Sequence, residues 1–464
     1  MRPHGKGFAN PARVSGWRAC DGHQLGVSGE RSDGTVVIRD VRIFDGVGDR
    51  VRDGHVVVAD TKIKAVGDGD PPSGGTVIDG RGAMLIPGLS DAHVHVILAG
   101  ATQAELMLGG AGLGYLKGAA EAEAMLMRGF TTVRDMAGDT GDLKRMIDAG
   151  ALPGPRIYPS QAGLSQTAGH GDFGMVYDVP TILGGTATRA EQLGVMRIAD
   201  GRDQVLAGVR EQLKKGASQI KMMAGGGVAS AYDHLDVLQY TPDELRAGVQ
   251  AAADWGTYVS VHVYTGAGIR RAVEAGVQVI EHGHLADEDD VRFMADHGIR
   301  LCIQPFAEGD HHFPDPVSAA KNRRVVEGVE RVFGWAVRHG VPIAFGTDLL
   351  LNPAESARQS AMLVRMAGLA GGPMAALRIA TSGNAELFRK SGARDPYQIP
   401  TPADVAAYGD APHLAHLGVI AEGAWADLLL VDGDLTRDLA PLADPANLKV
   451  IIKDGRVYKN TLAG

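Results

Sequence analysis

The chain has 464 residues, of which 45% are hydrophobic and 22% are charged, and its formal net charge is -9. This length exceeds what one hydrophobic core usually supports, so we expect a soluble enzyme with a large catalytic domain and a smaller accessory unit. The acidic balance without a basic stripe argues against a nucleic-acid partner, and no apolar run reaches the roughly 18 residues of a membrane span. Small molecules are the expected partners.

The first 34 residues contain scattered Arg and Gly but no apolar segment of the kind that marks a secretory signal. We expect residues 1–34 to be a flexible tail and the protein to be cytoplasmic. The only cysteines are Cys20 and Cys302, too few for a disulfide framework. Any metal site would therefore have to use histidines and carboxylates.

Short strand-like runs occupy both ends of the remaining chain. Residues 35–82 contain TVVIRDVRIFDG and HVVVADTKIKAVG, and residues 417–460 return to this pattern with ADLLLVDGD and LKVIIKDGRVYKN. Short runs separated by turn residues are typical of a β-sandwich. Because neither segment makes a full core alone, we expect residues 35–82 to pair with the end of a linker-and-strand segment at residues 401–464. Residues 83–400 would then form the catalytic domain.

Between these ends one unit recurs: a helix-like segment ends in Gly, and a short β-branched or aromatic run follows at once. Gly suits the left-handed conformation that ends a helix, and the run suits a buried parallel strand. With LIPGLSDAHVHV before the first unit and residues 155–160 after it, eight strands alternate with helices. This count favours an α/β fold of the (β/α)8 TIM-barrel type over a doubly wound sheet. The six units contain Gly129, Gly216, Gly256, Gly276, Gly298 and Gly340.

Ionisable residues stand at the C-terminal ends of five of the eight expected strands. Barrel enzymes carry their chemistry on that face. His93 and His95 are two residues apart on the first strand, so they share a face and can bind one ion. The set that we expect to form the metal site is His93, His95, Lys221, His262, His282 and Asp348.

Each member has a structural explanation when it is taken alone. Lys221 could form an ion pair from a strand end, and Asp348 could cap the helix that follows it. His262 and His282 could be hydrogen-bonded core histidines, and an HxH pair by itself is weak evidence. One structural explanation for the whole set is improbable, because His262, His282 and Asp348 fall independently at the ends of other strands.

The same residues carry a resemblance to a known family. The DAHVH of the first strand, the lysine of IKMMAGGGVAS, the histidines of VSVHVY and VIEHG and the aspartate of FGTD resemble the amidohydrolase superfamily with a bridging, carboxylated lysine. The resemblance covers residues 35–460. Within the superfamily, GLSQTAGHGD and AGGGVASAYDHLDVLQYT are similar to the branch that contains Xaa-Pro dipeptidases, related carboxypeptidases and ochratoxin-hydrolysing amidases.

The resemblance implies a centre of two divalent metal ions and a homo-oligomer. His93, His95 and Asp348 would hold the inner ion and His262 and His282 the outer one. A carbamate formed from Lys221 and carbon dioxide would bridge them. Zn is favoured because it suits imidazole and carboxylate ligands, while Mn, Co and Fe stay open. A hydroxide between ions about 3.5–4 Å apart would attack the substrate carbonyl, and Asp348 would carry its proton to the leaving amine.

Two loop residues on the catalytic face are candidates for substrate binding. His170 and Tyr232 can donate hydrogen bonds to a carboxylate or to a developing oxyanion, although ordinary surface positions would explain them as well. We expect a metal-dependent amidohydrolase that releases a C-terminal amino acid from dipeptides, N-acyl amino acids or ochratoxin A-like amides. The alternatives are a hydrolase of cyclic amides, lactones or imidazolones, and a non-catalytic scaffold with the same fold.

Overall fold

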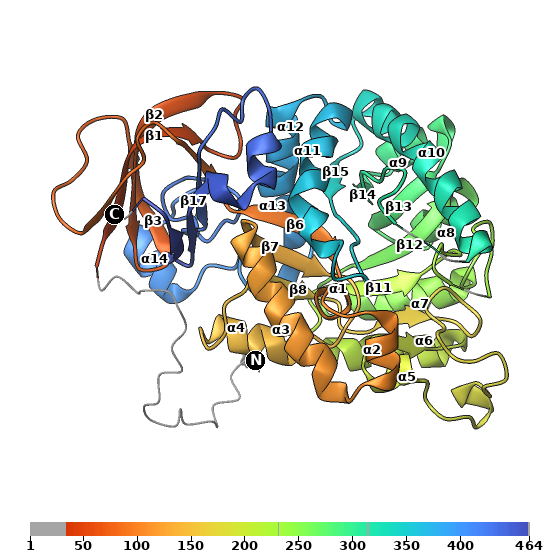
Figure 1. Cartoon of the computed structure of the whole chain (residues 1–464). Coiled ribbons are helices and arrows are strands. Elements are labelled where there is room, and N and C mark those ends of the chain that lie inside the picture. The colour runs from red at the N-terminus through yellow and green to blue at the C-terminus, as the bar shows by residue number, and fades with distance from the viewer. Residues whose placement is uncertain (1–33, 231, 312, 314, 463–464) are drawn as a thin grey trace, which may run out of the picture.

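The computed structural model describes residues 34–230, 232–311, 313 and 315–462. The tail expected at residues 1–34 lies outside the described residues except for its last residue. Figure 1 shows two parts side by side: a sheet at the left that contains both the red and the dark blue segments of the chain, and a ring of strands covered by helices at the right. Among the described residues, no helix is long and apolar enough to cross a membrane.

The part at the right is built on eight strands, each of which pairs in parallel with at least one other strand. Their positions agree with the eight strands that the sequence predicts. They are β6 (Leu89–Val94), β7 (Phe130–Asp135), β8 (Arg156–Pro159), β11 (Ile220–Met223), β12 (Val259–Thr265), β13 (Val279–Leu285), β14 (Arg300–Ile303) and β15 (Ile343–Phe345).

The ring closes through one interrupted strand and one backbone hydrogen bond. Gln161, with a φ of 60°, separates β8 from β9 (Gly163–Ser165), which also pairs with β10 (Met196–Ile198). β8 pairs with β7 and β9 pairs with β11, so the two pieces join the two hydrogen-bonded sheets. On the other side, the backbone N–H of Asp348 donates to the carbonyl of His93 at 2.8 Å. The predicted (β/α)8 barrel is confirmed.

Helices cover the outside of the ring (Figure 1). All six glycines that the sequence places after helices have positive φ, from 62° at Gly298 to 101° at Gly216, as a left-handed helix end requires. The longer helices are α3 (Ala111–Met127), α4 (Gly141–Asp148), α6 (Gly201–Lys214), α7 (Pro242–Ala253), α8 (Gly266–Glu274), α9 (Glu288–Asp296), α10 (Pro316–His339) and α11 (Gln359–Leu369). The shorter ones are α1 (Val96–Ala99), α2 (Gln103–Leu108), α5 (Arg189–Gln192), α12 (Pro373–Arg378), α13 (Asn384–Arg389) and α14 (Pro402–Tyr408).

The part at the left is one mixed sheet to which both chain ends contribute, as predicted. The order of its strands is β18-β17-β16-β5-β1-β2-β3, and β4 pairs with β1. The two ends meet where β16 pairs antiparallel with β5. The strands are β1 (Val36–Phe44), β2 (Val51–Ala59), β3 (Lys62–Gly67), β4 (Thr76–Asp79), β5 (Met84–Pro87), β16 (Leu428–Val431), β17 (Leu448–Lys453) and β18 (Arg456–Asn460).

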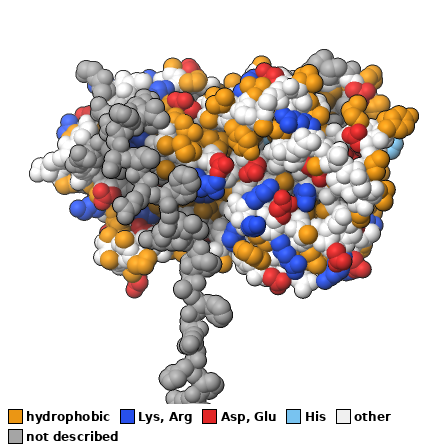
Figure 2. Space-filling model, turned by 90° about the horizontal axis from the view of Figure 1, so that it is seen from below, with side chains coloured by type: hydrophobic (Ala, Val, Ile, Leu, Met, Phe, Trp, Pro, Cys, Tyr) orange, Lys and Arg blue, Asp and Glu red, His pale blue; other side chains and the backbone are white. Residues whose placement is uncertain are grey.

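The two faces of the terminal sheet belong to different hydrophobic cores. Phe44 and Leu429 share one core with Leu126 and Phe333 of the barrel, whereas Ile43 and Leu428 belong to a second core within the terminal part. On the face that Figure 2 shows, Lys and Arg side chains lie among Asp and Glu side chains over the larger part, so charges of both signs are mixed there.

Candidate active site

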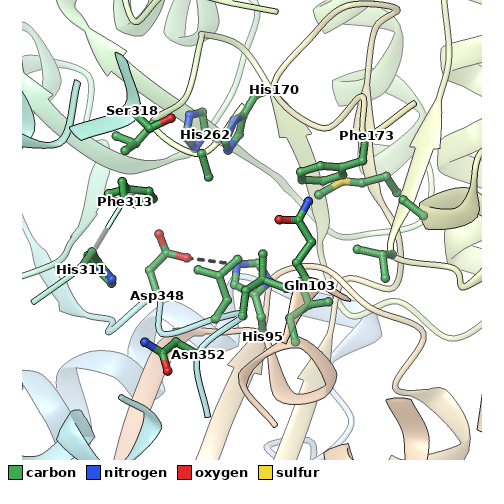
Figure 3. A pocket seen from close by; sticks show the side chains of 18 of the residues that line it. His95, Gln103, His170, Phe173, His262, His311, Phe313, Ser318, Asp348 and Asn352 are labelled. Carbon is green, nitrogen blue, oxygen red and sulfur yellow. Dashed lines mark hydrogen bonds and ion pairs between the residues drawn. The ribbon is translucent and has the colours of Figure 1, made fainter. Parts of the chain in front are cut away.

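The six predicted side chains meet at the C-terminal mouth of the barrel. They come from or directly after β6, β11, β12, β13 and β15, and all of them line one cavity of about 600 Å³. Five of them are buried, and only Asp348 is partly exposed to the cavity. Figure 3 shows Asp348 and His95 on one side of this cavity, with His262 across from them. The structure therefore brings together residues that lie up to 255 positions apart between His93 and Asp348.

Asp348 is the centre of the inner cluster. Its Oδ1 lies 3.1 Å from Nε2 of His95 and 3.3 Å from Nε2 of His93, and its Oδ2 lies 3.8 Å from Nδ1 of His282. Burial alone would raise the pKa of Asp348, but His93 and the other histidines outweigh it and hold this pKa well below its ordinary value. The carboxylate is therefore ionised and available as a ligand.

In each of three histidines, one ring nitrogen contacts a neighbouring oxygen atom. Nδ1 of His93 lies 2.7 Å from Glu281, Nδ1 of His282 lies 2.7 Å from the side-chain oxygen of Gln304, and Nε2 of His262 lies 3.1 Å from the carbonyl of Gly226. Each contact orients a ring and leaves its other nitrogen for the cavity, the arrangement that is common around metal-binding histidines.

The surroundings of one nitrogen atom indicate whether this cluster can bind a metal ion. Nε2 of His282 is buried and has no hydrogen-bond partner. Leaving a buried polar atom unsatisfied costs about 1–3 kcal/mol, and a metal ion would satisfy it. His93, His95 and Asp348 also place their ligand atoms within 4.8 Å of one another. The residues present therefore fit a metal centre.

Lys221 lies in β11 with its side chain buried at the same mouth. Burial lowers the pKa of Lys221, and it outweighs the carboxylates Glu281 and Asp348, which act in the opposite direction. This environment favours the neutral amine.

The sequence analysis did not identify Glu281, whose carboxylate contacts the ring of His93. Its carboxylate accepts a hydrogen bond from Arg134 at 2.6 Å and faces His93 on its other oxygen. Residues next to each other on a strand normally face opposite sides, so Glu281 and His282 are not both expected to contact the same cluster of side chains. His282 has a left-handed φ of 75°, which breaks the alternation. Without knowledge of that backbone angle, no sequence pattern points to Glu281.

The two predicted substrate-binding residues have different positions. His170 lines the cavity, and its ring stacks on His262 with 4.0 Å between centroids. Tyr232 does not line the cavity. It is 41% exposed, borders a separate pocket of about 210 Å³, and its hydroxyl donates to the carbonyl of Gly174 at 2.8 Å. The structure thus brings His170, but not Tyr232, together with the cluster, because the loop around Gly174 provides the partner for the Tyr232 hydroxyl.

The rest of the cavity is lined by both apolar and polar side chains. Figure 3 shows Phe173 and Gln103 on one side and His311, Phe313, Ser318 and Asn352 on the other. No arginine lines the cavity within the described part of the chain, and its only lysine is Lys221. The apolar residues of the lining include Leu98, Leu106, Met107, Phe173, Leu193 and Met196, and the polar ones include His311, Ser318, Asn322, Asn352 and Glu355.

Comparison with known proteins identifies the family. The pattern described as "Amidohydrolase family" matches residues 84–393, which is more than half of the chain. The chain belongs to the amidohydrolase family. It is a hydrolytic enzyme, as the strand-end residues of the sequence predict, and the alternative of a non-catalytic scaffold is not supported.

Individual amidohydrolases resemble the chain over most of its length. Ochratoxinase from Aspergillus niger is 29% identical over 439 residues, 90% of this chain and 85% of the ochratoxinase. Imidazolonepropionase from Anaeromyxobacter sp. (strain K) is 27% identical over 400 residues, 83% of this chain and 84% of that enzyme. The crystal structure of a prolidase complexed with N-methylphosphonate-L-proline has a TM-score of 0.80 and 33% identity, and the match covers 92% of this chain and 100% of the prolidase. These similarities confirm the branch that the sequence motifs indicate.

Proposed function

We propose that this amidohydrolase cleaves an amide bond and releases an amino acid with a free carboxylate from a dipeptide, an N-acyl amino acid or an ochratoxin A-like amide. The observation that carries the proposal is the convergence of six metal-competent side chains at one end of a large, mostly apolar cavity. The similarity to ochratoxinase and to a prolidase supports an amide substrate.

The six side chains would hold two ions. His93, His95 and Asp348 would hold the inner ion. His262, through Nδ1, and His282, through its unpartnered Nε2, would hold the outer one. The neutral amine of Lys221 would bond to the carbon of carbon dioxide and lose a proton, which gives an anionic oxygen ligand between the two positions. Imidazole and carboxylate ligands favour Zn.

Asp348 would move the proton. The bound ions would acidify a water molecule and polarise the substrate carbonyl. The ionised carboxylate of Asp348 would accept the proton of the attacking water and donate it to the leaving nitrogen, which then departs as an amine. The low pKa of Asp348 supports the first half of this role, since only the ionised carboxylate can accept a proton.

The walls of the cavity favour a bulky acyl group. A volume of about 600 Å³ is typical of a site for a drug-sized molecule. The side that contains Phe173, Leu106 and Met196 would take an apolar or aromatic acyl group. The opposite side would bind the amino-acid part through Ser318 and Asn322, which can donate hydrogen bonds to a carboxylate.

Hydrolysis of a cyclic amide, lactone or imidazolone is the second candidate, and the similarity to imidazolonepropionase favours it. The two candidates differ in whether the substrate is split or only opened.

A panel of dipeptides and N-acyl amino acids with small and aromatic acyl groups separates them, because a ninhydrin assay detects the released amino acid. We expect release, fastest with aromatic acyl groups, from enzyme that contains two metal ions per chain. Ring opening of lactams without release from any linear amide would overturn the first proposal. Asp348→Asn, loaded with the same metal, is the matched control for contaminating peptidases.

A further inference from the structure

Glu355 is a carboxylate of the cavity that the proposed chemistry does not use. Two other carboxylates line the cavity with it, and each of them has a role. Asp348 lies in the candidate metal cluster, and Asp315 accepts a hydrogen bond at 2.7 Å from the backbone N–H of Ser318 at the start of α10. The segment after β15 thus supplies the cavity with a second carboxylate, Glu355, besides Asp348.

The Glu355 carboxylate has a histidine beside it but no permanently charged partner. Its Oε2 lies 3.5 Å from Nδ1 of His311, and the two side chains are only 18% and 14% exposed. Hydrogen bonds to a charged group are normally about 2.7–2.9 Å long, so this contact is a weak one. Within the described part of the chain, no lysine or arginine forms an ion pair with Glu355. A partly buried carboxylate without a cation is costly, and a cationic ligand would stabilise it.

Two arginines that are close to Glu355 in the chain contact Asp310 instead. Nη1 of Arg358 donates to the carbonyl of Asp310 at 2.8 Å, and Nη2 of Arg365 donates to the Asp310 carboxylate at 3.1 Å. Asp310 lies in the loop after β14 and is 4% exposed. Both guanidinium groups are therefore held by this loop, and neither neutralises Glu355.

Aromatic rings lie beside the Glu355 carboxylate. The ring of His311 packs edge-to-face on Phe306 with 5.0 Å between centroids, and the centroid of Phe313 is 6.0 Å away from that of His311. All three rings line the cavity, and Figure 3 shows His311 and Phe313 together on one side of it. The faces of aromatic rings attract cations. A carboxylate with aromatic rings beside it is suited to bind an ammonium or a guanidinium group.

We propose that Glu355 is a specificity-determining residue that binds a cationic group of the substrate, an ammonium or a guanidinium, beside the rings of His311 and Phe313. This proposal rests on the proposed amide hydrolysis and selects among its substrates. Two parts of an amide can carry the cation: the free α-amino group of a dipeptide, or the side chain of a released arginine or lysine. N-acyl amino acids without a charged side chain, ochratoxin A-like amides included, are then the poorer substrates.

Two matched substrate pairs separate the two sources of the cation. N-benzoyl-arginine and N-benzoyl-citrulline differ in the charge of the side chain, and phenylalanyl-alanine and its N-acetyl derivative differ in the charge of the amino group. A hydrogen bond to a charged group predicts a kcat/KM about 10- to 100-fold higher for the cationic member of one pair in the wild type. The pair that shows the preference identifies the group that Glu355 binds. Equal values within both pairs overturn the proposal.

Variants of Glu355 test whether this residue causes the preference. Glu355→Gln keeps the shape of the side chain and removes its charge, so the ratio within the preferred pair should fall toward one. Glu355→Asp keeps the charge and should retain a preference for the cation. Glu330→Gln is the matched control, because Glu330 is exposed on α10 outside the cavity, and it should leave the ratio unchanged. A wild-type ratio in Glu355→Gln, with equal metal content, overturns the proposal.

Binding measurements distinguish a failure of this proposal from a failure of the proposed function. If the wild type splits none of these compounds, the proposed amide hydrolysis fails. Calorimetry of the metal-loaded wild type with the same compounds, which then stay intact, still measures whether the cationic member of a pair binds more tightly. Tighter binding that Glu355→Gln abolishes supports the cation site. Equal or undetectable binding within both pairs overturns it.

Discussion

Glu281 offers the sharpest test of how the site is supported. Its carboxylate is fully buried between Arg134 at 2.6 Å and His93 at 2.7 Å. Burial opposes the charge of Glu281, but Arg134 and then His93 outweigh it and hold the pKa of this carboxyl well below its ordinary value. Glu281→Gln keeps the shape of the side chain and removes its charge. The guanidinium of Arg134, itself 0% exposed, then has no compensating charge.

The expected loss is large because both partners are buried. Breaking a buried ion pair from one side costs about 3–5 kcal/mol, a substantial share of the roughly 5–15 kcal/mol that stabilises a typical domain. A side chain that orients a metal-binding histidine also raises metal affinity about 10–100-fold. We therefore expect Glu281→Gln to lower both the free energy of unfolding and the affinity for the inner ion.

Urea denaturation of the metal-free protein and titration with Zn²⁺ measure the two effects separately. Asp236→Asn is the matched control, since Asp236 pairs with Arg324 at 3.0 Å on the surface, where both side chains are more than half exposed. Such a pair contributes about 0–1 kcal/mol. Equal losses of stability in the two variants would refute the reasoning, because burial would then not decide the energy of the pair.

Three further predictions concern the proton transfer by Asp348, the pH dependence of stability through Lys62 and the surface at which a homo-oligomer would form. Asp348→Asn keeps an oxygen ligand but cannot accept a proton, so kcat should fall by about 10²-fold or more while metal analysis still finds two ions per chain; unchanged turnover removes this role. Burial lowers the pKa of Lys62 from 10.5 to about 8, so between these values the unfolded chain binds more protons and the free energy of unfolding should rise with pH. Urea denaturation at several pH values should show no such rise in the free energy of unfolding of the Lys62→Met variant. The implied homo-oligomer would bury Tyr177 and Leu183, now 93% and 73% exposed. Replacing both with Ser should lower the mass measured by light scattering, and an equal mass excludes this surface.

The convergence of the six side chains at the barrel mouth could be predicted because each member follows from a short-range rule. Gly at the end of a helix and the β-branched run after it locate each strand, and the C-terminal end of the strand locates the side chain. His262 and Asp348 were found in this way without any contact information. The pairing of the two chain ends was also predictable, because neither end can form a core alone.

Other features depend on backbone angles and loop paths that residue types do not determine. The left-handed Gln161 divides the third strand, although the sequence gives no Gly or Pro at that position. The left-handed backbone at His282 lets this side chain reach the cavity although the neighbouring Glu281 contacts His93. The sequence predicts Tyr232 in a loop on the catalytic face. The direction of its side chain, however, depends on the loop that contains Gly174, whose carbonyl accepts a hydrogen bond from the Tyr232 hydroxyl. Each of these outcomes is set by tertiary contacts rather than by local preference.

The pairing of β5 with β16 constrains how the protein can be made on the ribosome. About 340 residues separate Pro87 from Leu428. At about 5–20 residues per second, translation of this stretch takes roughly 17–70 s. During this time the edge of β5 that later binds β16 has no strand partner, and such an edge is prone to aggregation. A chain that stops before β16 therefore stays in that state, so premature termination near the end of the gene is expected to produce insoluble product even though the metal ligands have all been synthesised.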